Sequence, residues 1–306
     1  MSDLAVAVPV ATVWTGPEAP REIDAPAVRD APDVDAWAQS MDVVARQGLH
    51  GRTLTQALLG EPVDVVTEHG DWVEVVLPWQ PSATDPRGYP GWIRRAHLDS
   101  APQLGAATVV VTAATARMDM SEGSVLVSFG TRLPVRHRSE HSVTIETPGS
   151  RTGSLSTVDV QLYRPDRAIE TPALMAAARQ FLGLHYLWGG TSAWGLDCSG
   201  FVHLIHRTHG VTVRRDAYDQ HEQARPVPLD HARTGDLYFF ARPGARVHHV
   251  GFVTNSSGGP RAMLHAPESG KRIEDAPLAP HRLGSLLAAG RLLPHPPKGG
   301  TQGDLT

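Results

Sequence analysis

The chain has 306 residues, of which 41% are hydrophobic and 20% are charged, and its formal net charge is −4. This length suggests two or three domains with buried cores, and the slight acidic balance argues against a nucleic-acid-binding protein. The apolar stretches are too short to cross a membrane, and a single cysteine, Cys198, excludes an intrachain disulfide.

The N-terminal stretch MSDLAVAVPVATVWTG lacks the basic residues that open a secretory signal. It carries an acid at Asp3, and Pro9 interrupts its apolar run. We therefore expect a cytoplasmic protein, with export by another route as the alternative.

The first half of the chain is rich in β-strand patterns. Valines form two short runs around His69 and Gly70, which predicts a hairpin, and turn residues then lead into a short strand at Trp92 and Ile93. Short strands separated by Gly and Pro continue through the segments ATVVVTAATARM, GSVLVSFGTRLPV and HSVTIETPG. Two small β-barrels account for this pattern, and we assign them to residues 1–100 and 101–168.

Helical signals begin after these β domains. The segment TPALMAAARQFLG predicts a helix with Thr171 as N-cap, Pro172 at the first helical position and Gly183 just beyond the end. A second helix is expected over CSGFVHLIHRTHG, with its apolar residues on one face and Gly210 at its end.

Three strand patterns follow these helices, within GDLYFFA, HHVGFVTN and RAMLHAPE. Helices followed by consecutive strands predict an α+β domain, which we assign to residues 169–295. The Pro- and Gly-rich residues 296–306 are expected to form a flexible tail.

Cys198 is the first candidate for chemistry. It stands where the second predicted helix begins, and there unpaired N–H groups and the helix dipole favour a thiolate over a thiol. A buried packing role is the alternative for a lone cysteine.

A nucleophilic cysteine needs a base, and the predicted hairpin around Ser257 offers one. His249 and His265 are each eight residues from Ser257, so we expect them opposite one another, within one residue of register. A base on one strand, oriented by a polar side chain on its neighbour, is the arrangement that nucleophilic catalysis requires.

Three further histidines, His203, His206 and His209, recur at spacings of three on the second predicted helix. This spacing matches neither an i, i+4 pair nor a site completed by a carboxylate, so we do not predict a metal site. We expect these side chains on a solvated face of the helix.

Four segments, YLWGGTSAWGLDCSGFV, RTGDLYFF, HHVGFV and LHAPESG, resemble the NlpC-type cell-wall cysteine peptidases in order and spacing, over residues 171–293. The resemblance implies a papain-like α+β catalytic domain that needs no metal or other cofactor. It implies Cys198 as nucleophile, His249 as base and His265 as orienting residue. Tyr186 matches a tyrosine near the thiolate, although a packed aromatic with a surface hydroxyl is the alternative.

The N-terminal segments resemble bacterial SH3-like domains, and the order of the domains resembles the YkfC-like branch of the family. In that branch the substrate is a murein-derived peptide with a free N-terminal L-alanine, cleaved after γ-D-glutamate. The resemblance implies that Asp197 receives the ammonium group; Asp is also a favoured helix N-cap, and both roles can coexist. Tyr89 matches a tyrosine that closes the cleft, or else covers Trp92. Asp216 and Ser199 complete the predicted substrate-binding set.

The resulting hypothesis is a γ-D-glutamyl–diamino acid endopeptidase of cell-wall recycling, with murein-derived peptides as partners and neither nucleic acid nor membrane. A papain-like amidase or acyltransferase acting on another amide is one alternative. A wall-binding module with a decayed catalytic domain is the other.

Overall fold

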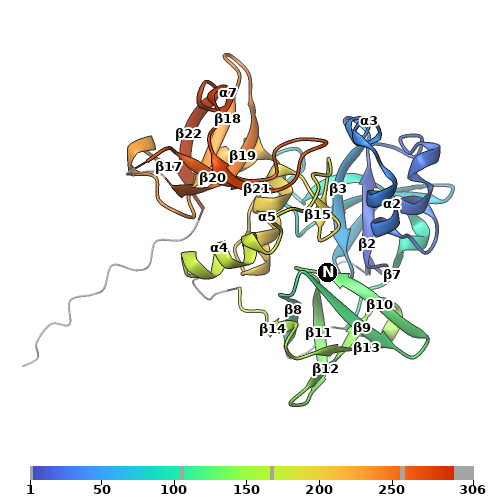
Figure 1. Ribbon diagram of the computed structural model, residues 1–306. Coiled ribbons are helices and arrows are strands. Elements are labelled where there is room, and N and C mark those ends of the chain that lie inside the picture. The colour runs from blue at the N-terminus through green and yellow to red at the C-terminus, as the bar shows by residue number, and fades with distance from the viewer. Residues whose placement is uncertain (1–2, 104–106, 166–168, 256–258, 293–306) are drawn as a thin grey trace, which may run out of the picture.

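The computed structural model describes residues 3–103, 107–165, 169–255 and 259–292. Residues 296–306, for which a flexible tail is predicted, and residues 256–258 of the predicted hairpin loop lie outside these ranges. The described chain forms two β units and a C-terminal α+β unit, and the three units pack around helix α5 (Cys198–Thr208) (Figure 1).

The first β unit is a strongly bent antiparallel sheet with strand order β3-β2-β6-β5-β4-β1-β7. Its hairpin β4–β5 turns at Gly70, which has φ +56, so the hairpin predicted at His69 and Gly70 is confirmed. The strands are β1 (Leu4–Val6), β2 (Val10–Trp14), β3 (Thr53–Leu58), β4 (Pro62–His69), β5 (Trp72–Leu77), β6 (Tyr89–Arg94) and β7 (Leu98–Ser100).

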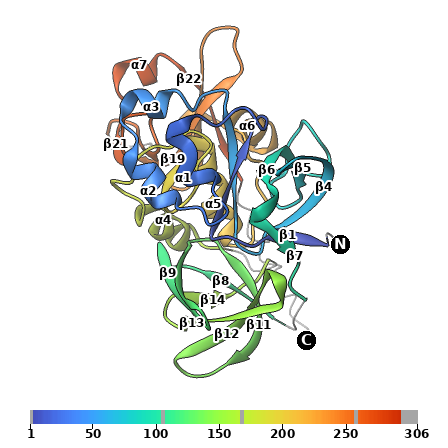
Figure 2. The same ribbon diagram turned by 90° about the vertical axis from the view of Figure 1, so that its right-hand side faces the viewer.

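Short helices interrupt this unit between β2 and β3, which the sequence reading did not anticipate. They are α1 (Ala25–Val28), α2 (Val34–Ser40) and α3 (Val43–Gln47). The signal for two of them is an aspartate N-cap: Asp33 accepts from the backbone N–H of Ala36 at 2.9 Å, and Asp42 accepts from that of Ala45 at 2.8 Å. These helices lie in front of the C-terminal unit in the view of Figure 2, and α3 contacts it through Arg46, which donates to the carbonyl of Tyr186 at 2.9 Å.

The second β unit is also antiparallel, with strand order β10-β9-β13-β12-β11-β8-β14. Its side chains Val127, Val143 and Ile145 form part of a separate core. The strands are β8 (Thr108–Val111), β9 (Thr115–Met120), β10 (Gly123–Ser128), β11 (Arg132–Arg138), β12 (Ser142–Thr147), β13 (Arg151–Ser156) and β14 (Val160–Leu162).

The C-terminal unit opens with helix α4 (Thr171–Arg179). Its N-cap is Glu170, so the prediction of Thr171 as N-cap is wrong by one residue, and Thr171 is the first helical residue. Both predicted helices are present, and Gly183 and Gly210 follow them with φ values of +84 and +83. The short strands β15 (Thr191–Ser192) and β16 (Gly195–Leu196) then lead directly into α5.

The sheet of this unit has the order β17-β22-β18-β19-β20-β21, and α5 packs against its central strand β19. The three predicted strands form its middle, flanked by strands that the sequence reading did not identify. The elements are α6 (Ala217–Gln223), β17 (Arg225–Val227), β18 (Leu237–Ala241), β19 (Val247–Asn255), β20 (Ala262–His265), β21 (Glu274–Pro277), α7 (Pro280–Leu283) and β22 (Leu286–Arg291).

One continuous core joins the first β unit to the C-terminal unit, because Trp14 and Trp37 belong to the same buried cluster as Phe201 on α5. A buried ion pair adds to this junction: Arg207 Nη1 lies 3.0 Å from Glu61 Oε1. Breaking such a pair leaves an uncompensated buried charge, so the two units are held in a fixed relation.

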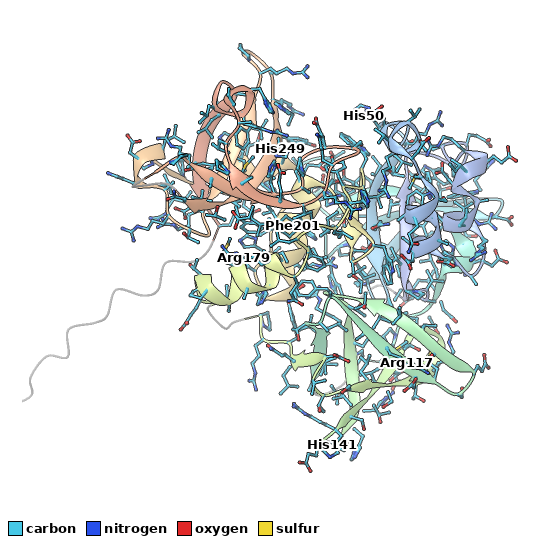
Figure 3. All side chains as sticks on the ribbon, in the orientation of Figure 1. His50, Arg117, His141, Arg179, Phe201 and His249 are labelled. Atoms are coloured by element: carbon cyan, nitrogen blue, oxygen red, sulfur yellow. The ribbon has the colours of Figure 1, made fainter. Side chains whose placement is uncertain are left out.

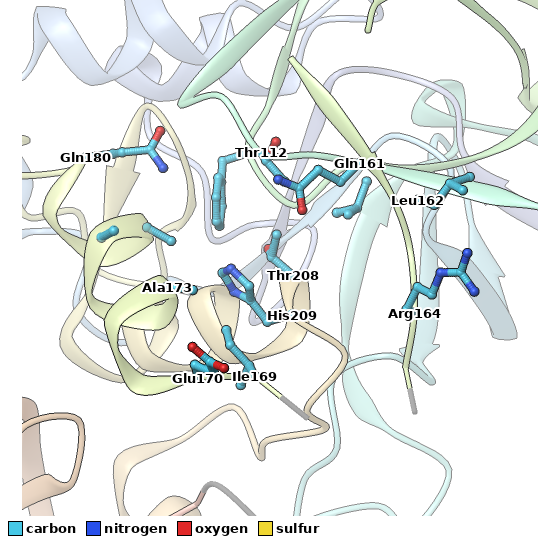
Figure 4. Close-up of a pocket in the computed structure, with 14 residues that line it drawn as sticks. Thr112, Gln161, Leu162, Arg164, Ile169, Glu170, Ala173, Gln180, Thr208 and His209 are labelled. Atoms are coloured by element: carbon cyan, nitrogen blue, oxygen red, sulfur yellow. The ribbon is translucent and has the colours of Figure 1, made fainter. Parts of the chain in front are cut away.

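A cavity of about 830 Å³ lies between the second β unit and helices α4 and α5 (Figure 4). Thr208 and His209 line it at the C-terminal end of α5, whereas Cys198 lies at the other end of this helix. The cavity therefore lies apart from the candidate catalytic residues. Within the described ranges, no helix is long and apolar enough to span a membrane.

Candidate active site

Cys198 is the first residue of α5, and its side chain is 7% exposed. The backbone N–H groups of Val250 and Ser199 face its sulfur. Because Val250 follows His249 on β19, this contact brings the helix N-terminus against the strand that carries the predicted base.

Asp197 caps α5 and is fully occupied by protein donors. Its carboxylate accepts from the backbone N–H groups of Gly200 at 2.6 Å and Gly189 at 2.9 Å. The buried Arg215 donates to its two oxygens at 2.7 and 3.0 Å. The hydroxyl of Ser199 also donates to it, at 3.2 Å. These contacts support the capping role of Asp197 and leave it already neutralised by Arg215.

The structure brings His249 and His265 into contact: Nε2 of His249 lies 2.7 Å from Nδ1 of His265. Their register differs from the prediction. Phe252 lies opposite Leu264, so the ladder leads toward Gly251 opposite His265, with His249 two residues further on. A shift of two keeps both rings on one face. The bulge between Val253 and Asn255 makes the shift even, because the Asn255–Ala262 register without it would place His249 three residues from the position opposite His265.

Gly251 makes this diagonal contact possible, because a Cβ at that position would approach Cβ of His265 to 2.7 Å. Both histidines are nearly buried, at 3% and 4% exposed. Figure 3 shows His249 on the C-terminal sheet and Phe201 on the neighbouring helix α5, while Arg117 lies on the second β unit, away from them.

The structure does not favour the thiolate at Cys198 that the sequence predicts. Burial, together with the Asp197 carboxylate, raises the pKa of Cys198 to about 12, despite the two backbone N–H groups at its sulfur. Burial lowers the pKa of His265 to about 3 and the pKa of His249 well below its usual value, and Arg282 lowers both. The resting site at neutral pH is therefore an uncharged thiol beside uncharged imidazoles.

Tyr186 is 5% exposed and lies close enough to Cys198 and Asp197 to be influenced by their charge. Burial, followed by these two groups, raises the pKa of its hydroxyl well above 10, so it stays a neutral donor. Arg46 of α3 donates to the backbone carbonyl of Tyr186 at 2.9 Å. The helices inserted in the first β unit thus help to position the candidate site.

Tyr89 and Asp216 meet across the junction between the first β unit and the C-terminal unit. The hydroxyl of Tyr89 lies 3.0 and 3.2 Å from the two carboxylate oxygens of Asp216, and that of Tyr218 lies 3.2 Å from one of them. Burial raises the pKa of Asp216 above its usual value, although Arg215 lowers it. Among the described side chains, no cation forms an ion pair with Asp216 within 4.0 Å.

The expectation of a solvated histidine face on α5 is wrong. His203 and His206 are fully buried, because α5 is enclosed by the first β unit and the C-terminal sheet. Nδ1 of His203 lies 2.7 Å from the carbonyl of Val213, and Nδ1 of His206 lies 2.8 Å from that of Val202. In the described part of the chain, no three His, Cys, Asp or Glu residues are grouped to hold a metal ion.

Two neighbours of the site were not identified from the sequence. Arg215 could not be linked to Asp197 because the two are 18 residues apart and meet only through a loop. Trp188 lies within the motif YLWGG, but the sequence gives no local signal for its contact with His50 of the first β unit, in which the two tilted rings have a centroid distance of 4.4 Å.

Two models of known protein families match parts of this chain. The model described as "NlpC/P60 family" matches residues 183–283, which include the cysteine and both histidines. The model described as "YKFC SH3b2 domain" matches residues 111–163, within the second β unit.

Relatives of nearly full length are also found. A protein of Bacillus cereus named gamma-D-glutamyl-L-lysine dipeptidyl-peptidase is 35% identical over 94% of this chain and 90% of its own length. A protein of the same name from Bacillus subtilis is 37% identical over 87% of this chain and 90% of its own length. The crystal structure of an NlpC/P60 family protein from Bacillus cereus superimposes with a TM-score of 0.89 and 33% identity, covering 95% of this chain and 99% of that one.

Proposed function

The chain belongs to the NlpC/P60 family of cysteine peptidases, and from this premise we propose that it hydrolyses the bond between γ-D-glutamate and a diamino acid in murein-derived peptides with a free N-terminal L-alanine. The observation that carries the proposal is the meeting of Cys198, at the start of α5, with the strand that holds the contacting pair His249 and His265. The names of the Bacillus relatives support the choice of bond.

The first step is attack by sulfur on the γ-carbonyl of D-glutamate. Because Nε2 of His249 is occupied by His265, its Nδ1 is the nitrogen left to take the thiol proton. A thiol with a pKa raised to about 12 requires this proton transfer to accompany attack. The backbone N–H of Cys198 and the neutral hydroxyl of Tyr186 stabilise the oxyanion.

The tetrahedral intermediate collapses when His249 returns the proton to the nitrogen of the leaving diamino acid, which breaks the amide bond. The dipeptide then remains on Cys198 as a thioester. Water, giving its proton to His249, attacks this thioester, and the thiol leaves with that proton as L-Ala-D-Glu is released.

For the free amine of L-alanine, the contacts favour Asp216 over Asp197. Asp197 is already neutralised by Arg215, whereas Asp216 has two phenol donors, Tyr89 and Tyr218, and a pKa that burial raises. An ammonium group bound there would supply the missing positive charge. Asp197 then acts through α5, holding the helix N-terminus under the nucleophile.

A substrate with a free L-alanine amine is a fragment released from the wall, because in the polymer this amine is acylated by the sugar strand. Recycling of such fragments in the cytoplasm is the role that we propose.

We expect N-acetylation of the tripeptide L-Ala-γ-D-Glu-diamino acid to lower kcat/KM by about 10²- to 10⁴-fold, because it removes the charge that Asp216 recognises. Replacing Asp216 with asparagine should lower kcat/KM for the free peptide by about 10²-fold and change that of the acetylated peptide little. Rates on both peptides, measured by liquid chromatography, test this.

Glu222→Gln is the matched control, since Glu222 lies on the same helix α6 with an exposed side chain that pairs with Arg214. It should leave both rates unchanged. Equal cleavage of free and acetylated peptides by the unaltered protein would instead favour a papain-like amidase acting on other amides. Binding of purified murein without any cleavage would favour a wall-binding module.

A further inference from the structure

His265 has a second polar neighbour that the cleavage steps above do not use. Its Nε2 lies 3.4 Å from Oε1 of Glu274, an ion-pair distance. The two residues lie directly opposite each other on β20 and β21. Glu274 thus continues the line of contacts that starts at His249, and its side chain, 56% exposed, has room to approach the ring.

We propose, on the basis of the function proposed above, that Glu274 is a positioning residue that sets the tautomers of the His265–His249 pair. It keeps the proton of His265 on Nε2, so that Nδ1 of His265 accepts from His249 and Nδ1 of His249 is left free to take the thiol proton.

The argument follows from counting protons along the line. In the 2.7 Å contact between His249 Nε2 and His265 Nδ1, one nitrogen donates and the other accepts. If His265 donates, its Nδ1 carries the proton, and His249 must then carry its own proton on Nδ1, where it cannot act as base. A carboxylate at Nε2 of His265 favours the other arrangement, because it accepts from an N–H and repels a lone pair.

The charges around the His249–His265 pair increase the expected effect of the Glu274 carboxylate. Besides burial, Arg282 on α7 and the rings of His265 and His248 disfavour an imidazolium at His249. Arg282 is fixed beside the pair, because it donates to the carbonyl of Pro267 at 3.2 Å and lies over the ring of Phe240 at 5.9 Å. Among the described residues, Glu274 is the acidic group at ion-pair distance from either ring, so it opposes the positive charge of Arg282 when His249 takes up the thiol proton.

Replacing Glu274 with glutamine is expected to lower kcat by about 2- to 5-fold with little change in KM, as befits an exposed charge acting on a buried pair. The acid limb of kcat/KM should move to lower pH by a few tenths of a unit, because the imidazolium loses a stabilising charge. Asp275→Asn is the matched control: it removes a carboxylate from the same strand, one that contacts Thr254 and Arg179 instead.

A second variant separates positioning from a general structural effect. His265→Asn keeps an oxygen that accepts from His249 but has no ring nitrogen for Glu274 to hold. In this background Glu274→Gln should have no further effect on kcat or on the acid limb.

An unchanged kcat and pH profile in Glu274→Gln would overturn the inference, and so would equal losses in the two backgrounds. Either outcome leaves the proposed function standing, because that function fails only if the unaltered protein does not cleave the γ-D-glutamyl bond.

Discussion

Replacing Cys198 with alanine is expected to abolish hydrolysis of L-Ala-γ-D-Glu-diamino acid, lowering kcat by at least about 10³-fold. Without the sulfur no thioester can form, and the oxyanion donors and bound histidines alone give only weak catalysis. Initial rates on the free tripeptide, at enzyme concentrations high enough to detect a 10³-fold loss, check this result.

The fold should survive this change, because the substitution removes one sulfur atom from a side chain that makes few specific contacts. Thermal unfolding should therefore shift by only a few degrees. A variant that keeps more than a tenth of the original rate, while folded, would show that Cys198 is not the nucleophile.

Mild acid is expected to destabilise the protein by several kcal/mol between pH 7 and pH 5. Histidines held neutral by burial take up protons only when the chain unfolds, so the free energy of unfolding falls as the pH drops below about 6.5. The fall continues until the pH reaches the folded-state pKa, about 4 for His206 and about 3 for His265. The most strongly affected histidines in this class are His203, His206, His249 and His265, and burial also lowers the pKa of His97 and His209.

Each such histidine contributes a slope of about 1.4 kcal/mol per pH unit. Asp216, whose pKa is raised, contributes with the opposite sign, but as a single group. Urea unfolding at a series of pH values measures the net slope. His206→Gln, which keeps a donor for the carbonyl of Val202, should reduce the slope by about 1.4 kcal/mol per pH unit. A free energy of unfolding that does not change with pH would contradict the burial of these rings.

Much of the α+β unit is predictable because its signals are local. The helix that starts at Cys198 is defined by an Asp N-cap, an apolar face and a glycine at its end, and each of these lies within a few residues of the next. The contact of His249 with His265 depends on a hairpin of fewer than twenty residues, so counting from the turn reaches the correct face and misses only the two-residue offset.

The remaining features depend on contacts between distant segments. The burial of His203 and His206 follows from the enclosure of α5: His206 stacks on Phe252 of β19 at a centroid distance of 5.6 Å, and the first β unit docks onto the helix through the pair of Arg207 with Glu61, 146 residues away. The occupancy of Asp197 by Arg215 likewise follows from tertiary packing. The helices between β2 and β3 have only four to seven residues each, too few for a hydrophobic period to show, and helices this short are stabilised by tertiary packing.

The same packing explains why the thiolate predicted at Cys198 is not favoured. A helix N-terminus favours a thiolate when it is reached by water, but Cys198 is buried beside a carboxylate. Burial therefore outweighs the local helix effect at the nucleophile.

The most direct test of the proposed activity is mass spectrometry of the products formed from L-Ala-γ-D-Glu-diamino acid. The account predicts L-Ala-D-Glu and the free diamino acid in equal amounts, with neither product formed by the Cys198→Ala variant. An intact tripeptide after prolonged incubation, or cleavage between alanine and glutamate, would contradict it.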